Sequence, residues 1–348
     1  MAELQGNFHG YPSLRRSLRC FLAITLIAAI AGASGQSPAC AWWFFHKKKP
    51  GDAATTSQGK RKARPTKAVQ VGLVPGNPPA LYWKPSAEPR AALLCLHELG
   101  LYKGVFDDLG QRMSREGVAV YAIDLRGFGD WQEAKEADAK MDLSKTLADV
   151  KGSVEILHKL HPNIPVFVLG EAMGGALALE AAAKFPDLIQ GTISAAPGGE
   201  HFNTASNYIK VTGHLMTARV NKDSGMSEEL MQVATPKAEL REALQSDEKV
   251  RLDLTPRELM ACQFYMYKTK NMARQIKDTP VLIVHGEQDG ESRPIGSTRV
   301  YERLATRDKK FLSIPDGDHY TFEDTKVSDL AMKGALSFID EHLSKKTQ

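Results

Sequence analysis

A glycine-rich segment near the middle of the chain has the pattern of a sharp strand-to-helix turn. Residues 170–175 read Gly-Glu-Ala-Met-Gly-Gly; they follow the apolar run 166–169 and precede a helical pattern. Glycines permit the tight backbone of such a turn, which lifts its central residue clear of the strand as a nucleophile. That residue is Ala172, and a methyl group cannot attack a substrate. The glycine spacing, with no Lys-Ser or Lys-Thr after it, does not fit a nucleotide-binding loop.

Polar side chains follow two later strand-like runs. Residues 285–289 read His-Gly-Glu-Gln-Asp, and residues 315–319 read Pro-Asp-Gly-Asp-His. Parallel sheets bind ligands just beyond the carboxyl ends of their strands. We therefore expect Asp289 and His319 to lie near Ala172. The alternative, two ordinary loop residues that share a hydrogen bond, stays open.

The spacing of apolar residues predicts the elements that must position these residues. Strand-like runs at 92–96, 118–123, 166–169, 188–194, 281–284 and 311–314 alternate with helical patterns at 106–116, 143–160, 176–184, 296–305 and 327–342. This alternation predicts an α/β fold with a mostly parallel, doubly wound sheet of buried strands. It fails at about 200–277, a Met-rich stretch that we interpret as an inserted helical cap. Its methionines could line an adaptable apolar pocket or simply fill the core.

The turn and its flanking motifs resemble those of a known superfamily. Residues 170–175 are similar to the Gly-x-Ser-x-Gly elbow of α/β-hydrolases, in the Ser-Met-Gly-Gly form of monoacylglycerol lipases and lysophospholipases of the serine aminopeptidase-like type. Ala172 stands where that family has serine. The resemblance implies the α/β-hydrolase fold, with Asp289 as the triad acid and His319 as the general base. The chain order of the three positions is the one that this fold uses.

The resemblance also extends to the loops before the elbow. Residues 95–100, Cys-Leu-His-Glu-Leu-Gly, are similar to the family's His-Gly-x-Gly loop, and residues 124–129 to its Asp-x-Arg-Gly-His-Gly turn. By this match, the backbone amides of Leu99 and Met173 would form the oxyanion hole. Glu98 departs from the pattern, because a carboxylate there would oppose the negative charge that the hole stabilises.

Charge is divided unevenly along the chain. Residues 1–67 hold 11 of the 45 Lys and Arg residues and 2 of the 41 acids, so they carry +9 and the rest carries −5. A body of that sign offers no basic face for nucleic acid, and we expect none as a partner. The four cysteines, at positions 20, 40, 95 and 262, lack the paired spacing of a disulfide framework or zinc site. Nothing in the sequence indicates a cofactor or a metal ion.

The first 67 residues have the composition of a targeting segment and a linker. Three arginines at positions 15, 16 and 19 precede an apolar run at 21–33, and small residues at 31–33 and 39–41 offer cleavage sites. We therefore interpret 1–41 as a signal peptide or an N-terminal anchor, and expect export to the periplasm or beyond. Residues 42–67 read as a basic, disordered linker whose aromatic and lysine residues could contact a membrane surface. The folded domain is expected to be 68–348.

These observations predict an exported protein of the carboxylic-ester hydrolase type whose catalysis is silenced by Ala172. Its ligand would be a small ester, an acylglycerol or another lipid-like molecule, as the resemblance implies. One alternative is a non-catalytic protein that binds or scaffolds acyl ligands. Another is hydrolysis through a different nucleophile, such as Ser194 or a water activated by His319.

Overall fold

The computed structural model of the protein describes residues 68–73, 80–134, 140–200 and 227–343. The expected segments 1–41 and 42–67, and the first part of the cap, lie outside the described residues. Among the described residues, no helix is both long and apolar enough to cross a bilayer.

The core of the fold is an eight-stranded sheet with the order β1-β2-β4-β3-β5-β6-β7-β8. Its strands are β1 (Val69–Val71), β2 (Ala80–Trp83), β3 (Ala91–Leu96), β4 (Val118–Ile123), β5 (Val166–Glu171), β6 (Gly191–Ala195), β7 (Val281–Gly286) and β8 (Lys309–Ile314). From β4 to β8 all neighbours pair in parallel, whereas β1 and β2 are antiparallel. The predicted fold class is confirmed.

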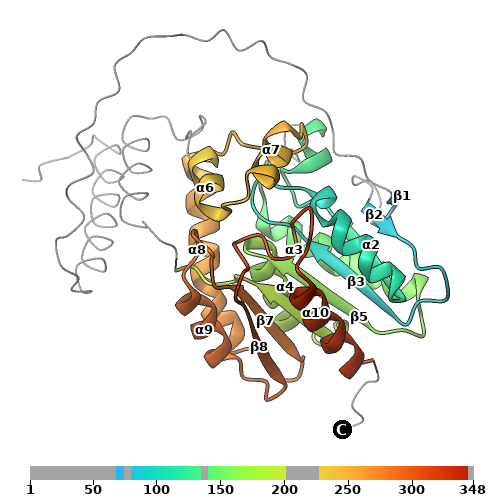
Figure 1. Ribbon diagram of the computed structural model, residues 1–348. Coiled ribbons are helices and arrows are strands. Elements are labelled where there is room, and N and C mark those ends of the chain that lie inside the picture. The colour runs from blue at the N-terminus through green and yellow to red at the C-terminus, as the bar shows by residue number, and fades with distance from the viewer. Residues whose placement is uncertain (1–67, 74–79, 135–139, 201–226, 344–348) are drawn as a thin grey trace, which may run out of the picture. The chain divides into compact units, whose positions relative to one another are not determined.

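Helices cover both faces of this sheet (Figure 1). They are α2 (Asp107–Arg115), α3 (Leu143–Leu160), α4 (Met173–Lys184), α9 (Pro294–Arg303) and α10 (Asp329–Glu341), with short 3₁₀ helices at Lys103–Phe106 and Gly129–Glu133. Alternate residues of one strand serve opposite faces: Leu93 joins the cluster under α2 and α10, and Leu94 joins the cluster under α3 and α4. The sheet is therefore apolar on both sides, as a doubly wound sheet requires.

Within the described residues, three helices interrupt the sheet between β6 and β7: α6 (Ser227–Ala234), α7 (Ala238–Ser246) and α8 (Pro256–Ala273). Helix α8 begins with a capping box, in which the Thr255 side chain accepts from the Glu258 amide while Glu258 accepts from the Thr255 amide. It contacts α4 and α9. These helices occupy the described part of the expected cap.

The predicted elements differ from the structure mainly at their ends. Strand β6 begins at Gly191, three residues later than expected, and α4 begins at Met173, directly after the elbow. Strand β8 is half-exposed and not buried, because it lies at the edge of the sheet. The antiparallel strands β1 and β2 were not predicted; their three- and four-residue lengths give too little periodicity to detect.

Candidate active site

The elbow between β5 and α4 is a tightly packed turn. Ala172 has φ 45° and ψ −109°, a conformation that non-glycine residues rarely adopt. Its amide donates to the Ala195 carbonyl at 2.9 Å, which ties the elbow to β6. A Cβ atom on Gly174 would lie 2.0 Å from the Leu96 carbonyl oxygen, so the start of α4 packs directly against the end of β3. The strained turn is thus held by its neighbours on both sides.

The structure brings Asp289 and His319 into contact, 30 residues apart in the chain. His319 Nδ1 donates to Asp289 Oδ2 at 2.7 Å, and both side chains are buried. Asp289 also accepts from the amides of Glu291 and Ser292, each at 2.8 Å, and from the Ser292 hydroxyl at 2.5 Å. These donors fix the orientation of the carboxylate toward the imidazole. The two predicted residues therefore have the geometry of an acid–histidine pair, each beyond the end of a strand.

The other ring nitrogen of His319 faces Glu98. The distance from His319 Nε2 to Glu98 Oε1 is 3.2 Å, and Glu98 is 7% exposed. The Glu98 amide donates to Glu323 Oε1 at 2.8 Å, which holds this residue against the histidine loop. The side chain that departs from the family pattern thus points into the site. With a carboxylate at each nitrogen, the imidazole is suited to carry both protons.

Electrostatics favour the same protonation state. Burial alone would lower the pKa of His319, but the charges of Asp289, Glu98 and Glu291 outweigh burial and raise this pKa well above its usual value. The Asp289 carboxyl would in turn be raised by burial, yet His319 holds its pKa down at about 2. Because an imidazolium has no free lone pair, His319 cannot accept a proton in this state.

A buried carboxylate next to the elbow anchors the histidine loop. Both oxygens of Glu171 accept backbone N–H groups: Oε1 from Thr321 at 2.6 Å, and Oε2 from Phe322 at 2.9 Å and Glu323 at 3.0 Å. Glu171 is fully buried, and this burial raises its pKa to about 8 despite the three donors. Its contacts are with the loop backbone, so Glu171 positions His319 from the neighbouring strand.

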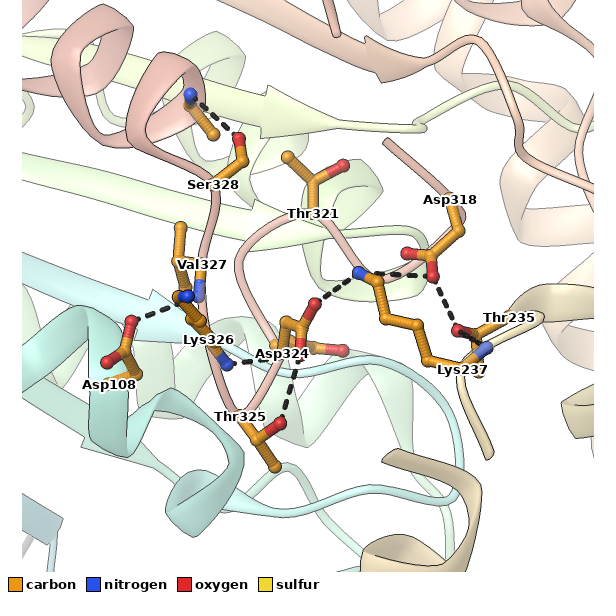
Figure 2. Close-up of polar contacts among 12 residues, drawn as sticks. Asp108, Thr235, Lys237, Asp318, Thr321, Asp324, Thr325, Lys326, Val327 and Ser328 are labelled. Atoms are coloured by element: carbon orange, nitrogen blue, oxygen red, sulfur yellow. Dashed lines mark hydrogen bonds and ion pairs between the residues drawn. The ribbon is translucent and has the colours of Figure 1, made fainter. Parts of the chain in front are cut away.

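The link between α6 and α7 also contacts the histidine loop (Figure 2). Lys237 forms ion pairs with Asp318, at 3.3 Å, and with Asp324. Thr235 donates to Asp318 Oδ2 at 2.5 Å, and the His319 amide donates to the Ala234 carbonyl at 3.0 Å. The described part of the cap is therefore attached directly to the residue that carries the imidazole.

The two expected oxyanion donors lie in the loop after β3 and at the start of α4. Met173 is the first residue of α4, and Leu99 follows β3 in the loop that contains Glu98. A pocket of about 50 Å³ opens beside this loop, lined by Glu98, Glu291 and apolar side chains that include Leu99 and Met231. The role of both amides remains a prediction.

Three acidic residues of the site were not assigned from the sequence. Glu291 and Glu323 follow the motifs at 285–289 and 315–319 without belonging to them, and Glu98 was noted only as a departure from a motif. The signal for Glu291 and Glu323 was a run of acids in and after these two motifs. Such runs are common on solvated loops, so burial had to be seen in the structure.

His97, in the loop after β3, has a structural role. His97 Nε2 accepts from the Leu125 amide at 2.9 Å, so Nδ1 carries the proton that bonds the Glu98 carbonyl at 2.6 Å. Burial lowers the pKa of His97 to about 4. His97 is thus a neutral link between the loop after β3 and the loop after β4.

Comparison with known proteins identifies the family. The serine aminopeptidase S33 family matches residues 87–326. The chain is 24% identical over 267 residues to a monoacylglycerol lipase of Mycolicibacterium smegmatis. This match covers 75% of this chain and 92% of that protein. It is 36% identical over 116 residues to the monoglyceride lipase of Rattus norvegicus, in a segment that covers 33% of this chain and 38% of the rat protein.

Solved structures show the same fold. A soluble variant of the monoglyceride lipase from Saccharomyces cerevisiae, crystallised with a substrate analogue, superposes with a TM-score of 0.66 at 21% identity, covering 81% of this chain and 99% of that one. The monoacylglycerol lipase of Paleococcus ferrophilus superposes with a TM-score of 0.61 at 20% identity, covering 76% and 98%. The chain therefore belongs to the serine aminopeptidase S33 family and is a monoacylglycerol lipase-like α/β-hydrolase with alanine at the elbow.

Proposed function

We propose that this protein is a monoacylglycerol lipase-type scaffold in which the serine mechanism of ester hydrolysis is silenced. The observation that carries the proposal is the environment of His319 Nε2, the atom that would accept the proton of an elbow serine. That atom faces Glu98, and Ala172 has no hydroxyl to offer it. This site therefore differs from an active triad at two positions, Ala172 and Glu98.

A substrate class follows from the relatives. The similar proteins from Mycolicibacterium and rat are named as lipases of monoacylglycerols or monoglycerides. We propose that a monoacylglycerol or a related ester is the ligand of this site. The pocket of about 50 Å³ that the described residues line holds little more than a water molecule or two, which is less than an acyl chain needs.

Restoring the missing groups tests the silencing. We would compare hydrolysis of a monoacylglycerol and a p-nitrophenyl ester by the wild-type chain, Ala172→Ser, and Ala172→Ser/Glu98→Gly. The wild type should stay near background and the double variant should exceed it by at least about 100-fold. The single serine variant should be slower than the double variant, because Glu98 still competes for His319.

The control is the double variant with His319→Ala added, which should return to background. Wild-type hydrolysis equal to that of the double variant would contradict the proposal. It would point to another nucleophile. Ser194 is poorly placed for that role, since it is fully buried and its hydroxyl donates to the Gly175 carbonyl at 2.9 Å.

Binding without turnover is the second candidate function, and the apolar wall of the pocket favours it. A monoacylglycerol that binds the folded state should raise the melting temperature of the wild type. At 100 times its dissociation constant, the ligand should add about 2.7 kcal/mol to the unfolding free energy. A panel of acyl lengths that produces no shift would argue against this function.

A further inference from the structure

His319 and two glutamates form a group of three potential metal ligands. Nε2 of His319, a carboxylate oxygen of Glu98 and a carboxylate oxygen of Glu291 all lie within 4.8 Å of one another. Nε2 is 3.2 Å from Glu98 Oε1 and 3.9 Å from Glu291 Oε2. The three come from the loops after β3, β7 and β8. Parallel strands thus bring Glu98 next to two ligands that lie more than 190 residues later in the chain.

Glu98 presents an oxygen that lacks a protein partner. The Glu98 side chain is about nine-tenths buried. Its Oε2 atom is buried too, yet it has no hydrogen-bond partner among the described residues. Leaving a buried carboxylate oxygen unsatisfied is costly. A bound cation would satisfy it.

The outer contacts of His319 fit the same interpretation. Histidines that bind a metal usually donate their other ring N–H to a carboxylate, which fixes the ring and increases its basicity. Asp289 Oδ2 occupies that position at 2.7 Å from Nδ1. Nε2 is consequently aimed at the two glutamates.

The site gathers more carboxyl groups than positively charged side chains. Glu98, Glu171 and Glu323 are buried around His319, and none of them forms an ion pair with Lys or Arg in the described part of the chain. One imidazolium offsets a single negative charge, whereas a divalent cation would offset two.

The spacing suits a small first-row ion. Bonds of about 2.1 Å to nitrogen and oxygen in a tetrahedral site place the ligand atoms about 3.4 Å apart. The distances from Nε2 to the two glutamates, 3.2 and 3.9 Å, bracket that value, and all three ligand atoms lie within 4.8 Å of one another, so side-chain rotations would complete the site. An imidazole ligand favours Zn²⁺ over Mg²⁺ or Ca²⁺, which prefer oxygen ligands.

We propose that Glu98, Glu291 and His319 bind a divalent transition-metal ion, with Zn²⁺ as the best match, on the side of the imidazole that an elbow serine would face. A water molecule would complete the coordination from the adjacent pocket. Binding releases the proton from Nε2. The inference does not rest on the proposed function, because the ligands would bind the ion whether or not a lipid enters the site.

Calorimetry on the full-length chain tests this site. Protein treated with EDTA and dialysed is titrated with Zn²⁺, alongside Glu98→Gln, Glu291→Gln and the matched control Glu287→Gln from the same loop. The wild type and Glu287→Gln should show the same strong binding event. Each ligand variant should weaken that event by at least tenfold, and Asp289→Asn, which replaces the outer carboxylate with a neutral amide, by about 10- to 100-fold.

A second measurement needs no variant. Zn²⁺ should raise the melting temperature of the EDTA-treated wild type, and Mg²⁺ at the same concentration should raise it less. Equal isotherms for the wild type and both ligand variants would place any Zn²⁺ elsewhere on the chain and overturn the proposal. Absence of both saturable binding and a melting shift would also overturn it, and Glu98 would then serve as an ion-pair partner of His319.

Discussion

Ala172 has the backbone conformation of a nucleophile although it carries no nucleophile. Its φ of 45° is shared among the described non-glycine residues only by Ala196, at 44°. Such conformations cost of order 1–3 kcal/mol and persist where the surrounding structure imposes them. Here the hydrogen bond to Ala195 and the contact of Gly174 with β3 impose it. The turn thus has a strained backbone although it carries no serine.

Relief of this strain should be measurable. Glycine accepts positive φ without a penalty, so Ala172→Gly should raise the free energy of unfolding by about 1 kcal/mol. The control is Ala183→Gly in the last turn of α4, which should lower the free energy of unfolding by about 0.5–1 kcal/mol. Urea unfolding measures both. A loss of stability in Ala172→Gly would show that the turn is unstrained.

At the scale of elements, the site depends on close contact between α4 and the end of β3. A Cβ on Gly174 would meet the backbone of Leu96 and His97 at 2.0–2.7 Å, whereas a Cβ on Gly152 in α3 has no atom within 4 Å. The two glycines lie in helices on the same face of the sheet. They form a matched pair that separates packing from helix propensity.

Alanine should therefore have opposite effects at the two positions. Gly174→Ala should lower the free energy of unfolding by about 1–3 kcal/mol, because backbone atoms must move. Gly152→Ala should raise it by about 0.5–1 kcal/mol through its helix propensity. Chemical unfolding with a common slope would check both values, and a neutral Gly174→Ala would mean that the loop after β3 yields freely.

A second contact between elements should depend on pH. Glu200, beyond β6, pairs with Lys270 of α8 at 2.6 Å and with Arg299 of α9 at 3.1 Å. Burial would raise the pKa of Glu200, but these two cations outweigh burial and lower it below 4.5. A lowered carboxyl pKa contributes stability that is present above the unfolded pKa and is lost as the pH falls through the folded one.

Glu200→Gln should cost about 1 kcal/mol of unfolding free energy at pH 7. The difference from the wild type should hold down to about pH 5 and shrink below about pH 4.5, as the wild-type carboxylate takes up its proton. Urea unfolding at a series of pH values measures this. Glu302→Gln, on an exposed part of α9, is the control that should show little change, and a pH-independent cost for Glu200→Gln would contradict the electrostatic explanation.

At the scale of the whole molecule, charge separates the first 67 residues, at +9, from the remaining −5. We propose that the first part directs export and then contacts anionic lipid. Fusion of residues 1–41 to alkaline phosphatase, which is active only after it crosses the membrane, should give an active reporter. A variant of the fusion in which glutamate replaces the three arginines at positions 15, 16 and 19 should give an inactive reporter. Equal activity of both fusions would reject the signal interpretation.

Lipid contact should depend on salt. The full chain should sediment with vesicles that contain phosphatidylglycerol, and less so as salt rises, because juxtamembrane Lys and Arg residues contribute about 1 kcal/mol each near such a surface. A chain that begins at residue 68 should stay in solution. Binding of this shorter chain to the same vesicles would place the lipid contact in the α/β-hydrolase domain instead.

The sequence by itself determined the fold class and the order of the site positions. Buried parallel strands are continuous apolar runs, and the elbow glycines mark their turn, so local patterns sufficed to predict both. Short edge strands such as β1 were not predicted, since three residues are too few to show a periodic pattern. Tertiary structure alone decided that Glu98 faces His319 and that Glu171 holds the histidine loop. The direction of a side chain on a loop depends on packing between segments far apart in the chain, and the cost of a buried charge depends on every neighbour within a few ångströms.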